Sequence, residues 1–445
     1  MPSLASGPPP AAGSLRRAAF AVAGGALLVR VAFVIWAPPS LASDAEFYYG
    51  HALALMRGNG YTNADGSPAA LWMPGWAAWM ALLFKVFGPR VLVAQLGNAV
   101  LGAATAGFVC ALGGRLFSLR VGVIAGAFWA LWPSVVFFTA ILFTETLFTA
   151  LFTAGVLGVV VASQAEARRS LWLVAAGAAL SAALWVRSEP FGFLPVFALF
   201  LAWTGASWRR GALGAALLLG VMALGIAPWT IRNAVAFGHF IPTAANGGWV
   251  FYEGNHPGAP GGNDLLAMFA LRENFDHLSI GQGDVECNVE GLRLGLAFVR
   301  DHPVEALQIA SRKLALTYGR DDRAPVLIRG FSGPMKVLRS RHVPLHGYIP
   351  EGFMTVMQRV SNAYWYAMLA LVAIGLSGVL GWRPESRILV LGSMLTWVGV
   401  HSALIGGPRF HQPETTLLAI VAALGVERVL AGLRRLHAVL AQPVE

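Results

Sequence analysis

Long apolar segments separated by short polar loops recur along most of the chain. A helix that crosses the hydrocarbon core of a bilayer needs about 20 mostly apolar residues. Segments near this length predict about ten transmembrane helices, at 17–38, 91–113, 120–138, 141–163, 170–187, 190–205, 211–231, 361–381, 387–405 and 413–432. The hydrophobic pattern therefore predicts an all-α integral membrane protein.

The first loop, residues 39–90, carries a short apolar segment of its own. Residues 71–88 contain Pro74 and Gly75 and are shorter than most of the predicted spans. We expect a helix that lies in the membrane interface, with its tryptophans at headgroup depth. If this segment crossed the membrane instead, every later basic loop would change sides.

The longest polar stretch, residues 233–360, separates the seventh and eighth spans and is predicted to be an outer region. Asn246-Gly247-Gly248 and the Gly-, Pro- and Asn-rich segment 254–263 predict turns and irregular loop. Residues 291–318 have apolar positions at helical spacing on both sides of Pro303, which predicts two amphipathic helices. The expected parts of the chain are a disordered cytoplasmic tail (1–16), an N-terminal transmembrane module (17–232), the outer region (233–360) and C-terminal helices with a tail (361–445).

Charge sets the expected orientation. Only 12% of residues are charged, against about 25% in soluble domains. The formal net charge is +10, but most arginines lie in short loops between apolar segments, so no nucleic-acid partner is predicted. Because cytoplasmic loops carry an excess of arginine and lysine, the cytoplasmic side is predicted to hold Arg16-Arg17, Arg115–Arg120, Arg168-Arg169, Arg209-Arg210, Arg383–Arg387 and Arg434-Arg435.

Two acidic positions lie at the opposite, outer ends of spans. Asp44 is expected to begin a helix over 44–57, on which Asp44, Tyr48 and His51 share one face and Glu46 points elsewhere. Glu145 is expected near the outer end of the span 141–163. Each acid would either favour a helix N-terminus by its charge or take part in chemistry. Because carboxylates near lipid are costly, a catalytic role is an alternative to helix capping for both acids. Asp44 is the stronger candidate for a general base.

Several arginines accompany these acids. Arg187, Arg232 and Arg409 lie at outer ends of spans, where few arginines are expected. Arg30 lies inside the first span, where it would either reach the headgroups or face the bundle and bind an anion. Guanidinium groups bind phosphate oxygens through paired hydrogen bonds, so these arginines are candidate phosphate ligands.

Acids and arginines at one surface, together with a large outer loop, favour an enzyme. The rival is a flippase or transporter for a lipid-linked or anionic solute, which would place charges near the bilayer midplane and often shows repeated halves. We find no internal repeat, no Walker loop and no serine-hydrolase elbow. An oligosaccharide ligase is a further alternative, expected to depend on outer arginines and His256. No metal-ligand spacing appears, because the histidines are widely scattered: His256, His401 and His411.

At these positions the chain resembles bacterial membrane glycosyltransferases of the C-type fold, similar to protein O-mannosyltransferases and to lipid A aminoarabinose transferase. The resemblance covers nearly the whole chain through motifs in a fixed order: Asp44-x-x-x-Tyr48, Gly58-x-Gly60-Tyr61, Pro74-Gly75-Trp76, Glu145-Thr146-Leu147, Pro228-Trp229-Thr230-Ile231-Arg232-Asn233, Gly247-Gly248…Gly254-Asn255 and Arg409-Phe410-x-x-Pro413. Many relatives carry adjacent acids in the first outer loop, whereas Ala45 here separates Asp44 from Glu46.

The resemblance implies a multi-pass enzyme of the bacterial cytoplasmic (inner) membrane with its active site facing the periplasm. Such an enzyme moves a hexosyl or pentosyl group, with inversion, from a polyprenyl-phosphate carrier to a hydroxyl of a lipid, glycan or protein. It implies a catalytic base at Asp44. From the residues themselves we expect a catalytic role for Glu145, which would hydrogen-bond the sugar or the acceptor. The expected substrate- and phosphate-binding residues are Arg30, Glu46, Tyr48, Tyr61, Arg187, Arg232, Asn255 and Arg409. No cofactor follows, because dependence on a divalent metal varies across the superfamily.

Overall fold

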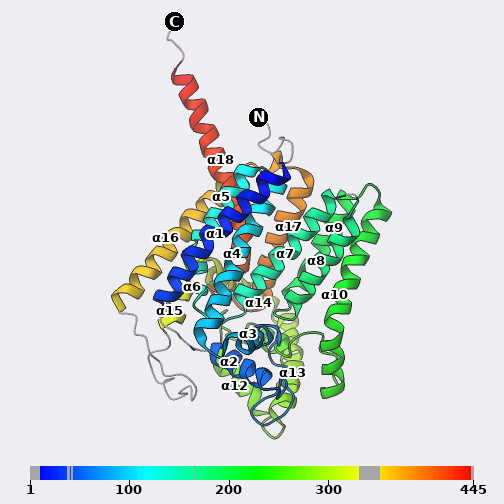
Figure 1. Cartoon of the computed structure of the whole chain (residues 1–445). Coiled ribbons are helices and arrows are strands. Elements are labelled where there is room, and N and C mark those ends of the chain that lie inside the picture. Colours follow the sequence, from blue (N-terminus) through cyan, green and yellow to red (C-terminus); the bar gives the residue numbers. More distant parts are fainter. Residues whose placement is uncertain (1–10, 38–40, 42–43, 166, 330–350, 442–445) are drawn as a thin grey trace.

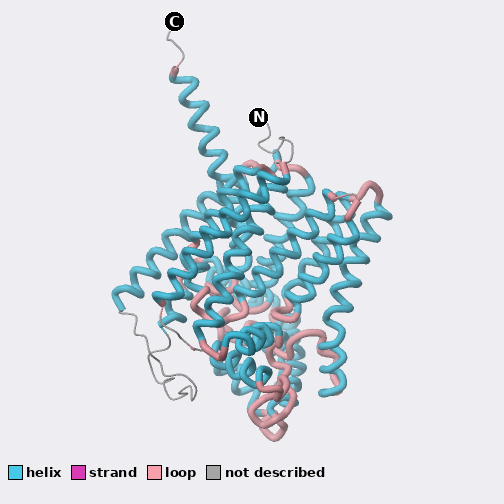
Figure 2. Tube along the Cα trace, in the orientation of Figure 1, coloured by secondary structure: helices cyan, strands magenta, loops and turns pink. Residues whose placement is uncertain are grey.

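The computed structural model describes residues 11–37, 41, 44–165, 167–329 and 351–441. In these ranges the secondary structure is helical and contains no strand, as Figure 2 shows. The predicted all-α class is thus confirmed. Residues 1–10 of the expected tail and 330–350 of the expected outer region lie outside the described residues.

Long helices form a bundle (Figure 1). They are α1 (Ala12–Trp36), α4 (Val91–Leu116), α5 (Leu119–Leu131), α7 (Glu145–Gln164), α8 (Arg169–Leu184), α9 (Leu194–Thr204), α10 (Trp208–Phe237), α16 (Glu351–Leu376), α17 (Pro384–Ala403) and α18 (Thr415–Leu440). Each predicted span overlaps one of them. Among the described helices, five are long and apolar enough to cross a membrane: α1, α4, α7, α10 and the stretch Gln412–Leu440 that includes α18. The chain is therefore a multi-pass membrane protein.

Some boundaries differ from the predictions. The helix α1 begins at Ala12, so residues 12–16, which were expected to be disordered, are helical. The helix α16 begins at Glu351, ten residues before the predicted span. The span expected at 120–138 is two helices, α5 and α6 (Pro133–Phe138), because Pro133 lacks the N–H that a continuous helix requires.

An irregular buried segment, residues 139–144, separates α6 from α7. Buried carbonyl groups at membrane depth need hydrogen-bond donors from the protein. Three side chains supply them: Gln95 Nε2 to Ala140 O at 2.9 Å, Asn98 Nδ2 to Thr139 O at 3.3 Å and Ile141 O at 3.0 Å, and Trp76 Nε1 to Leu142 O at 3.0 Å. These bonds explain why α7 starts at Glu145 rather than at 141, and why Trp76 is buried rather than facing headgroups.

Small residues allow close helix packing. A Cβ added to Gly107 of α4 would lie 3.2 Å from the carbonyl oxygen of Ala19 in α1. A Cβ on Gly113 of α4 would lie 3.1 Å from the Cα of Gly122 in α5. Membrane helices commonly associate through such small residues, since van der Waals contact replaces the hydrophobic effect there.

The remaining helices, apart from η3, lie toward the end of the bundle away from both termini, where Figure 1 shows α2, α3, α12 and α13. They are α2 (Asp44–Met56), α3 (Gly75–Phe87), η1 (Glu189–Phe193), α11 (Gly247–Glu253), α12 (Leu265–Glu273), α13 (Ile280–Asp301), α14 (Pro303–Tyr318), α15 (Arg323–Arg329) and η4 (Gln412–Glu414), whereas η3 (Val379–Gly381) links α16 to α17. With 13 residues, α3 is about 20 Å long and too short to cross a core about 30 Å thick.

The outer region follows the predicted pattern in part. Two helices, α13 and α14, flank Pro303 as expected, although α13 already begins at Ile280. Asn246-Gly247-Gly248 was expected to form a turn, but Gly247 starts the helix α11. Glycine serves packing here, because a Cβ on Gly291 of α13 would lie 2.8 Å from the carbonyl oxygen of Gly248.

Candidate functional site

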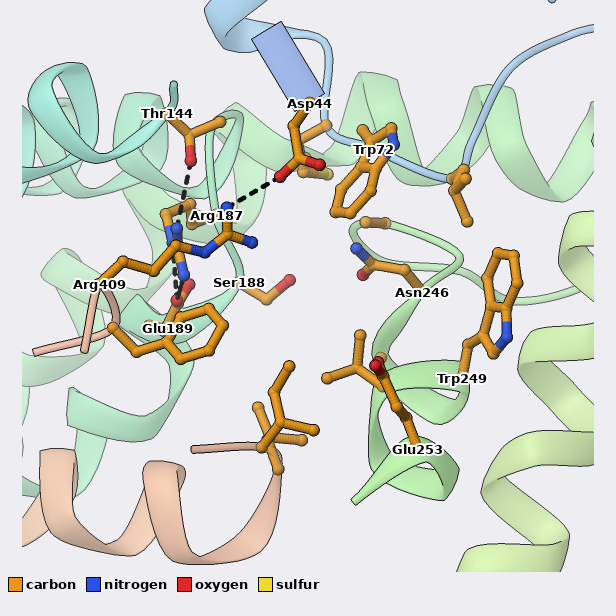
Figure 3. A pocket seen from close by; sticks show the side chains of 18 of the residues that line it. Asp44, Trp72, Thr144, Arg187, Ser188, Glu189, Asn246, Trp249, Glu253 and Arg409 are labelled. Carbon is orange, nitrogen blue, oxygen red and sulfur yellow. Dashed lines mark hydrogen bonds and ion pairs between the residues drawn. The ribbon is translucent and has the colours of Figure 1, made fainter. Parts of the chain in front are cut away.

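A cavity of about 450 Å³ lies where several helices end or begin. Its lining comes from α2, the start of α7, the turn between α8 and η1, α11, and the loop between α17 and α18. Figure 3 shows its charged side chains arriving from separate segments of the chain. Five residues predicted from the sequence line it: Asp44, Tyr48, Glu145, Arg187 and Arg409. The structure thus brings together residues from both halves of the chain.

Asp44 and Arg409 form an ion pair in this cavity (Figure 3). Arg409 Nη1 donates a hydrogen bond to Asp44 Oδ2 at 3.0 Å. Asp44 is the first residue of α2, a position where the helix dipole favours a carboxylate. The Arg409 guanidinium also lies over the rings of Phe143 and Phe410, at 5.2 and 5.0 Å. A carboxylate and an aromatic-flanked guanidinium therefore face one cavity side by side.

Arg187 joins two further acids. Its Nη1 lies 3.3 Å from Glu145 Oε1, and its Nε donates to Glu189 Oε1 at 2.7 Å. Nη1 also donates to Thr144 Oγ1 at 3.2 Å. Because Glu145 is only 2% exposed, its charge requires this partner. The cluster fixes the start of α7 against the turn after α8.

The opposite wall of the cavity carries Glu253, which the sequence did not single out. Its Oε1 accepts hydrogen bonds from the backbone N–H of Asp264 at 2.6 Å and from Asn263 Nδ2 at 3.1 Å. Burial raises the pKa of Glu253, and these hydrogen bonds oppose the rise. Tyr48 also faces the cavity, and burial followed by the charge of Asp44 raises its pKa well above the ordinary value. The Tyr48 phenol therefore remains a hydrogen-bond donor.

Arg30 does not line the cavity. It is fully buried between α1, α4 and α5, and its Nη1 donates to the carbonyl oxygens of Ala130 at 3.0 Å and Ala26 at 3.3 Å. Its guanidinium lies 4.9 Å from the centre of the Trp129 ring. Gly102 leaves the room, since a Cβ there would lie 2.8 Å from Arg30 Cδ. Arg30 neither reaches the headgroups nor occupies the position expected of a phosphate ligand.

Tyr61 and Arg232 hold the loop between α2 and α3 instead of facing the cavity. The Tyr61 hydroxyl donates to the carbonyl oxygen of Trp72 at 3.1 Å. Arg232 of α10 donates to the carbonyl oxygens of Ala69 and Tyr61, at 2.8 and 3.3 Å. Neither residue lines the cavity, so the sequence predicted them as ligands where the structure shows loop anchors.

Asn255 is also bound into the fold. Its Nδ2 donates to the carbonyl oxygen of Ala403 at 2.8 Å, and its Oδ1 accepts from Lys313 Nζ at 2.9 Å. Lys313, fully buried, also donates to the carbonyl oxygen of Ser402 at 3.2 Å. Together they cap the end of α17 just before the loop that carries Arg409. Glu46, half-buried on α2, does not line the cavity either.

Behind Arg409 lies His411, a buried histidine to which the sequence analysis assigned no role. His411 Nδ1 lies 2.6 Å from the carbonyl oxygen of Thr317, and Nε2 lies 3.2 Å from Asp321 Oδ1. The ring stacks on Trp365 with centres 4.2 Å apart. Burial lowers the pKa of His411, but the hydrogen bond and charge of Asp321 outweigh it, so the net pKa is raised. Because His411 follows Arg409 by two residues, these contacts position the Arg409 loop.

Asp321 is itself held from a second side. Its Oδ2 accepts from Trp132 Nε1 at 2.9 Å and from Ser134 Oγ at 2.6 Å. Its backbone N–H donates to Asn362 Oδ1 of α16 at 2.8 Å. The break at Pro133 therefore does more than end α5, because it presents two donors to the acid that holds His411.

Among the described residues, no group of three or more His, Cys, Asp and Glu side chains is placed to hold a metal ion. In the cavity, the Asp44 carboxylate contacts the Arg409 guanidinium, and the Glu145 carboxylate contacts the Arg187 guanidinium. Both carboxylates are thus paired with arginine, which brings positive charge into the cavity.

No protein-family model and no curated protein sequence matches the chain. Its fold is similar to the archaeal oligosaccharyltransferase AglB from Archaeoglobus fulgidus in complex with an inhibitory peptide and a dolichol-phosphate. The TM-score is 0.56 at 15% identity, over 96% of this chain and 52% of that chain. The complex of the same enzyme with Zn and sulfate gives 0.57 at 14% identity, over 93% and 49%. The chain thus spans about half the length of this enzyme.

ArnT from Cupriavidus metallidurans bound to undecaprenyl phosphate matches with a TM-score of 0.44 at 16% identity, over 93% of this chain and 78% of that chain. At such identities the similarity shows the fold alone. The assignment of the fold rests on the oligosaccharyltransferase, which has the higher TM-score. The chain therefore has the C-type fold of the membrane glycosyltransferases that its motifs resemble.

Proposed function

We propose that the chain is a glycosyltransferase that moves a hexosyl or pentosyl group from a polyprenyl-phosphate carrier to an acceptor hydroxyl. The observation that carries this proposal is the pair of Asp44 and Arg409, 3.0 Å apart in a cavity at one end of the helix bundle. The fold supports it, since the structure of AglB with a similar fold contains a dolichol-phosphate. The acceptor is a hydroxyl of a lipid, a glycan or a protein.

The reaction is a single displacement. Asp44 takes the proton of the acceptor hydroxyl, and the acceptor oxygen bonds to the anomeric carbon. The bond between that carbon and the phosphate oxygen breaks on the opposite face, so the configuration inverts and polyprenyl phosphate leaves. A positioned base of this kind contributes about 10²–10⁴-fold in rate.

Arg409 stabilises the leaving phosphate. A guanidinium has five N–H donors, and the bond to Asp44 uses one of them. The remaining donors match phosphate oxygens in geometry and charge. Charge that develops on the leaving oxygen is therefore neutralised by a group already in place.

The other polar residues of the cavity orient the reactants. Glu145, held by Arg187, accepts hydrogen bonds from sugar or acceptor hydroxyls, and Tyr48 donates one. The segment 246–263, which contains α11 and contributes Asn246, Glu253 and Asn263 to the lining, covers the cavity. No step requires a metal ligand from these residues.

The proposed location is the cytoplasmic (inner) membrane of a bacterium, with the cavity open to the periplasm. The basic loops support this location, because they lie at the opposite end of the bundle from the cavity. Two of them meet where Arg383 Nη2 donates to the carbonyl oxygen of Arg115, and both termini lie at the same end (Figure 1). Reporter fusions after Leu116 and within 258–262 are expected to report opposite sides. Two cytoplasmic signals would contradict the orientation.

Turnover of lipid-linked sugars tests the function. Purified wild type, Asp44→Asn and Glu46→Gln in nanodiscs are incubated with a panel of polyprenyl-phosphate sugars and membrane extract, and donor loss is followed by mass spectrometry. Glu46 is the matched control, because it lies on α2 outside the cavity. We expect wild type and Glu46→Gln to consume one donor and Asp44→Asn to lose that activity. Donor binding or transport without consumption in any variant would instead indicate a flippase.

A further inference from the structure

A second cavity, of about 600 Å³, lies at the end of the bundle that holds both termini, opposite the proposed active site. It is formed where α8 and α10 begin. Its polar lining consists of Arg168, Arg169, Ser170 and Arg210, and the rest of its wall is apolar. In the described part of the chain, no ion pair joins these arginines to a carboxylate.

Arg169 is the unusual member of this group. Its side chain lines the cavity but is only 9% exposed, and Nη2 has no hydrogen-bond partner among the described residues. Gly214 makes room for it, since a Cβ there would lie 3.0 Å from Nη2. A buried charged group without an acceptor costs free energy, so this guanidinium nitrogen is arranged for a partner that the described chain does not supply.

The helix ends add to the positive charge. The helix α8 has 16 residues, begins at Arg169, and has neither a side-chain cap nor an acid in its first turn. The helix α10 has 30 residues and carries Arg209 and Arg210 in its first turn. Because a helix N-terminus carries partial positive charge, arginine there is unfavourable unless an anion compensates it.

Topology alone does not account for this arrangement. Arginines that only set orientation extend into water, as the exposed Arg209 does. Arg169 is instead enclosed between α8 and α10. The apolar side chains beside it, Leu171 and Leu213, are exposed on the surface of the bundle.

We infer that the cavity of Arg168, Arg169 and Arg210 is a binding site for a phosphate-bearing anion, separate from the site of sugar transfer. Guanidinium groups and free N–H groups of α8 bind the phosphate oxygens. The exposed leucines beside it fit the acyl chains of a phospholipid, which makes the headgroup of an anionic phospholipid the favoured source. Free phosphate has the same headgroup chemistry without the chains.

Lipid titration of the purified full chain in detergent tests this site. Bound ligand is counted by native mass spectrometry, and the melting temperature is recorded with phosphatidylglycerol, phosphatidylcholine or inorganic phosphate. The wild type is expected to bind phosphatidylglycerol in preference to phosphatidylcholine, with a rise in melting temperature. Arg169→Gln should weaken that binding about ten- to a hundredfold, the effect of losing a charged hydrogen bond. Arg209→Gln, exposed and outside the cavity, is the matched control and should bind as wild type does.

The two sources give different results. Stabilisation by phosphatidylglycerol alone identifies a lipid headgroup, and stabilisation by phosphate as well identifies a site for the free anion. If Arg169→Gln fails to fold, the same titration of Gly214→Ala and Arg210→Gln tests the site instead. Each of these changes perturbs the cavity and should weaken phosphatidylglycerol binding in a folded chain.

Three results would overturn the inference. They are no response of wild type to either anion, an equal loss of binding in Arg209→Gln, and destabilisation without any anion response in Glu166→Gln, which replaces the acid three residues before Arg169 in the sequence. The last would mean that an acid of the chain itself is the partner of Arg169.

Discussion

The two ends of the helix bundle hold arginine in opposite ways. At the end with the proposed active site, Arg187 and Arg409 each contact carboxylates at 3.3 Å or less. At the other end, Arg169 is buried with a free nitrogen and no acidic partner among the described residues. Paired arginines are held in a fixed position by their carboxylates, and Arg409 keeps N–H donors for a phosphate that arrives and leaves. An unpaired, enclosed arginine suits an anion that stays.

Removing a paired arginine should have the largest effect. Arg187→Gln leaves Glu145, which is 2% exposed, without its counter-charge, and breaking a buried pair costs about 3–5 kcal/mol. We expect a large fall in melting temperature in detergent. The double variant Arg187→Gln/Glu145→Gln should recover most of it, because it removes the unpaired carboxylate. A double variant no more stable than the single one would contradict the pairing.

The next largest effect is expected on turnover. Arg409→Gln should reduce sugar transfer about 10²–10³-fold, the usual cost of removing one group that stabilises developing charge. Arg209→Gln at the other end should leave turnover unchanged. Steady-state rates of donor consumption for the two variants provide the measurement, and equal losses would mean that overall charge rather than position matters.

The buried histidine predicts a pH effect on stability. The folded-state pKa of His411 is raised above the ordinary 6.5, with Asp321 and Glu414 as the acids that face it. Its contribution is therefore complete below pH 6.5 and is lost as pH rises through the raised value. The melting temperature of wild type should fall over this range, and that of His411→Gln should be lower but flatter. Parallel curves would show that another group titrates.

The smallest effect is expected for Glu46→Gln. This residue lies on the same helix as Asp44 but outside the cavity, and substitutions away from buried networks usually change stability by less than about 0.5 kcal/mol. Both melting temperature and turnover should match wild type. A tenfold loss of turnover would return Glu46 to the site.

Hydrophobic pattern and charge predicted much of this arrangement. The helical class, a separate short helix at α3 and the meeting of Asp44, Glu145, Arg187 and Arg409 follow from segment length and from which ends of spans carry charge. What the sequence could not show is the direction in which each arginine side chain points. Arg232 has the chemistry of a phosphate ligand, yet it donates to loop carbonyl oxygens, and such use depends on backbone geometry.

The supporting residues were not predictable for a related reason. Asn98 and Lys313 have no motif, because their task is to satisfy carbonyl groups of segments that leave the helical pattern. Asp321 and His411 are distant in sequence. They come into contact because residues beside the break at Pro133 hold Asp321 and the loop before α18 carries His411. A pattern of spans predicts where helices run, whereas these residues are determined by where helices stop.

The configuration of the transferred sugar tests the central claim most directly. With the donor that wild type consumes, the product is isolated and the anomeric configuration of its new bond is compared with that of the donor by NMR. Single displacement with Asp44 as base predicts inversion. Retention would require two displacements through a covalent intermediate and would contradict the proposed role of Asp44.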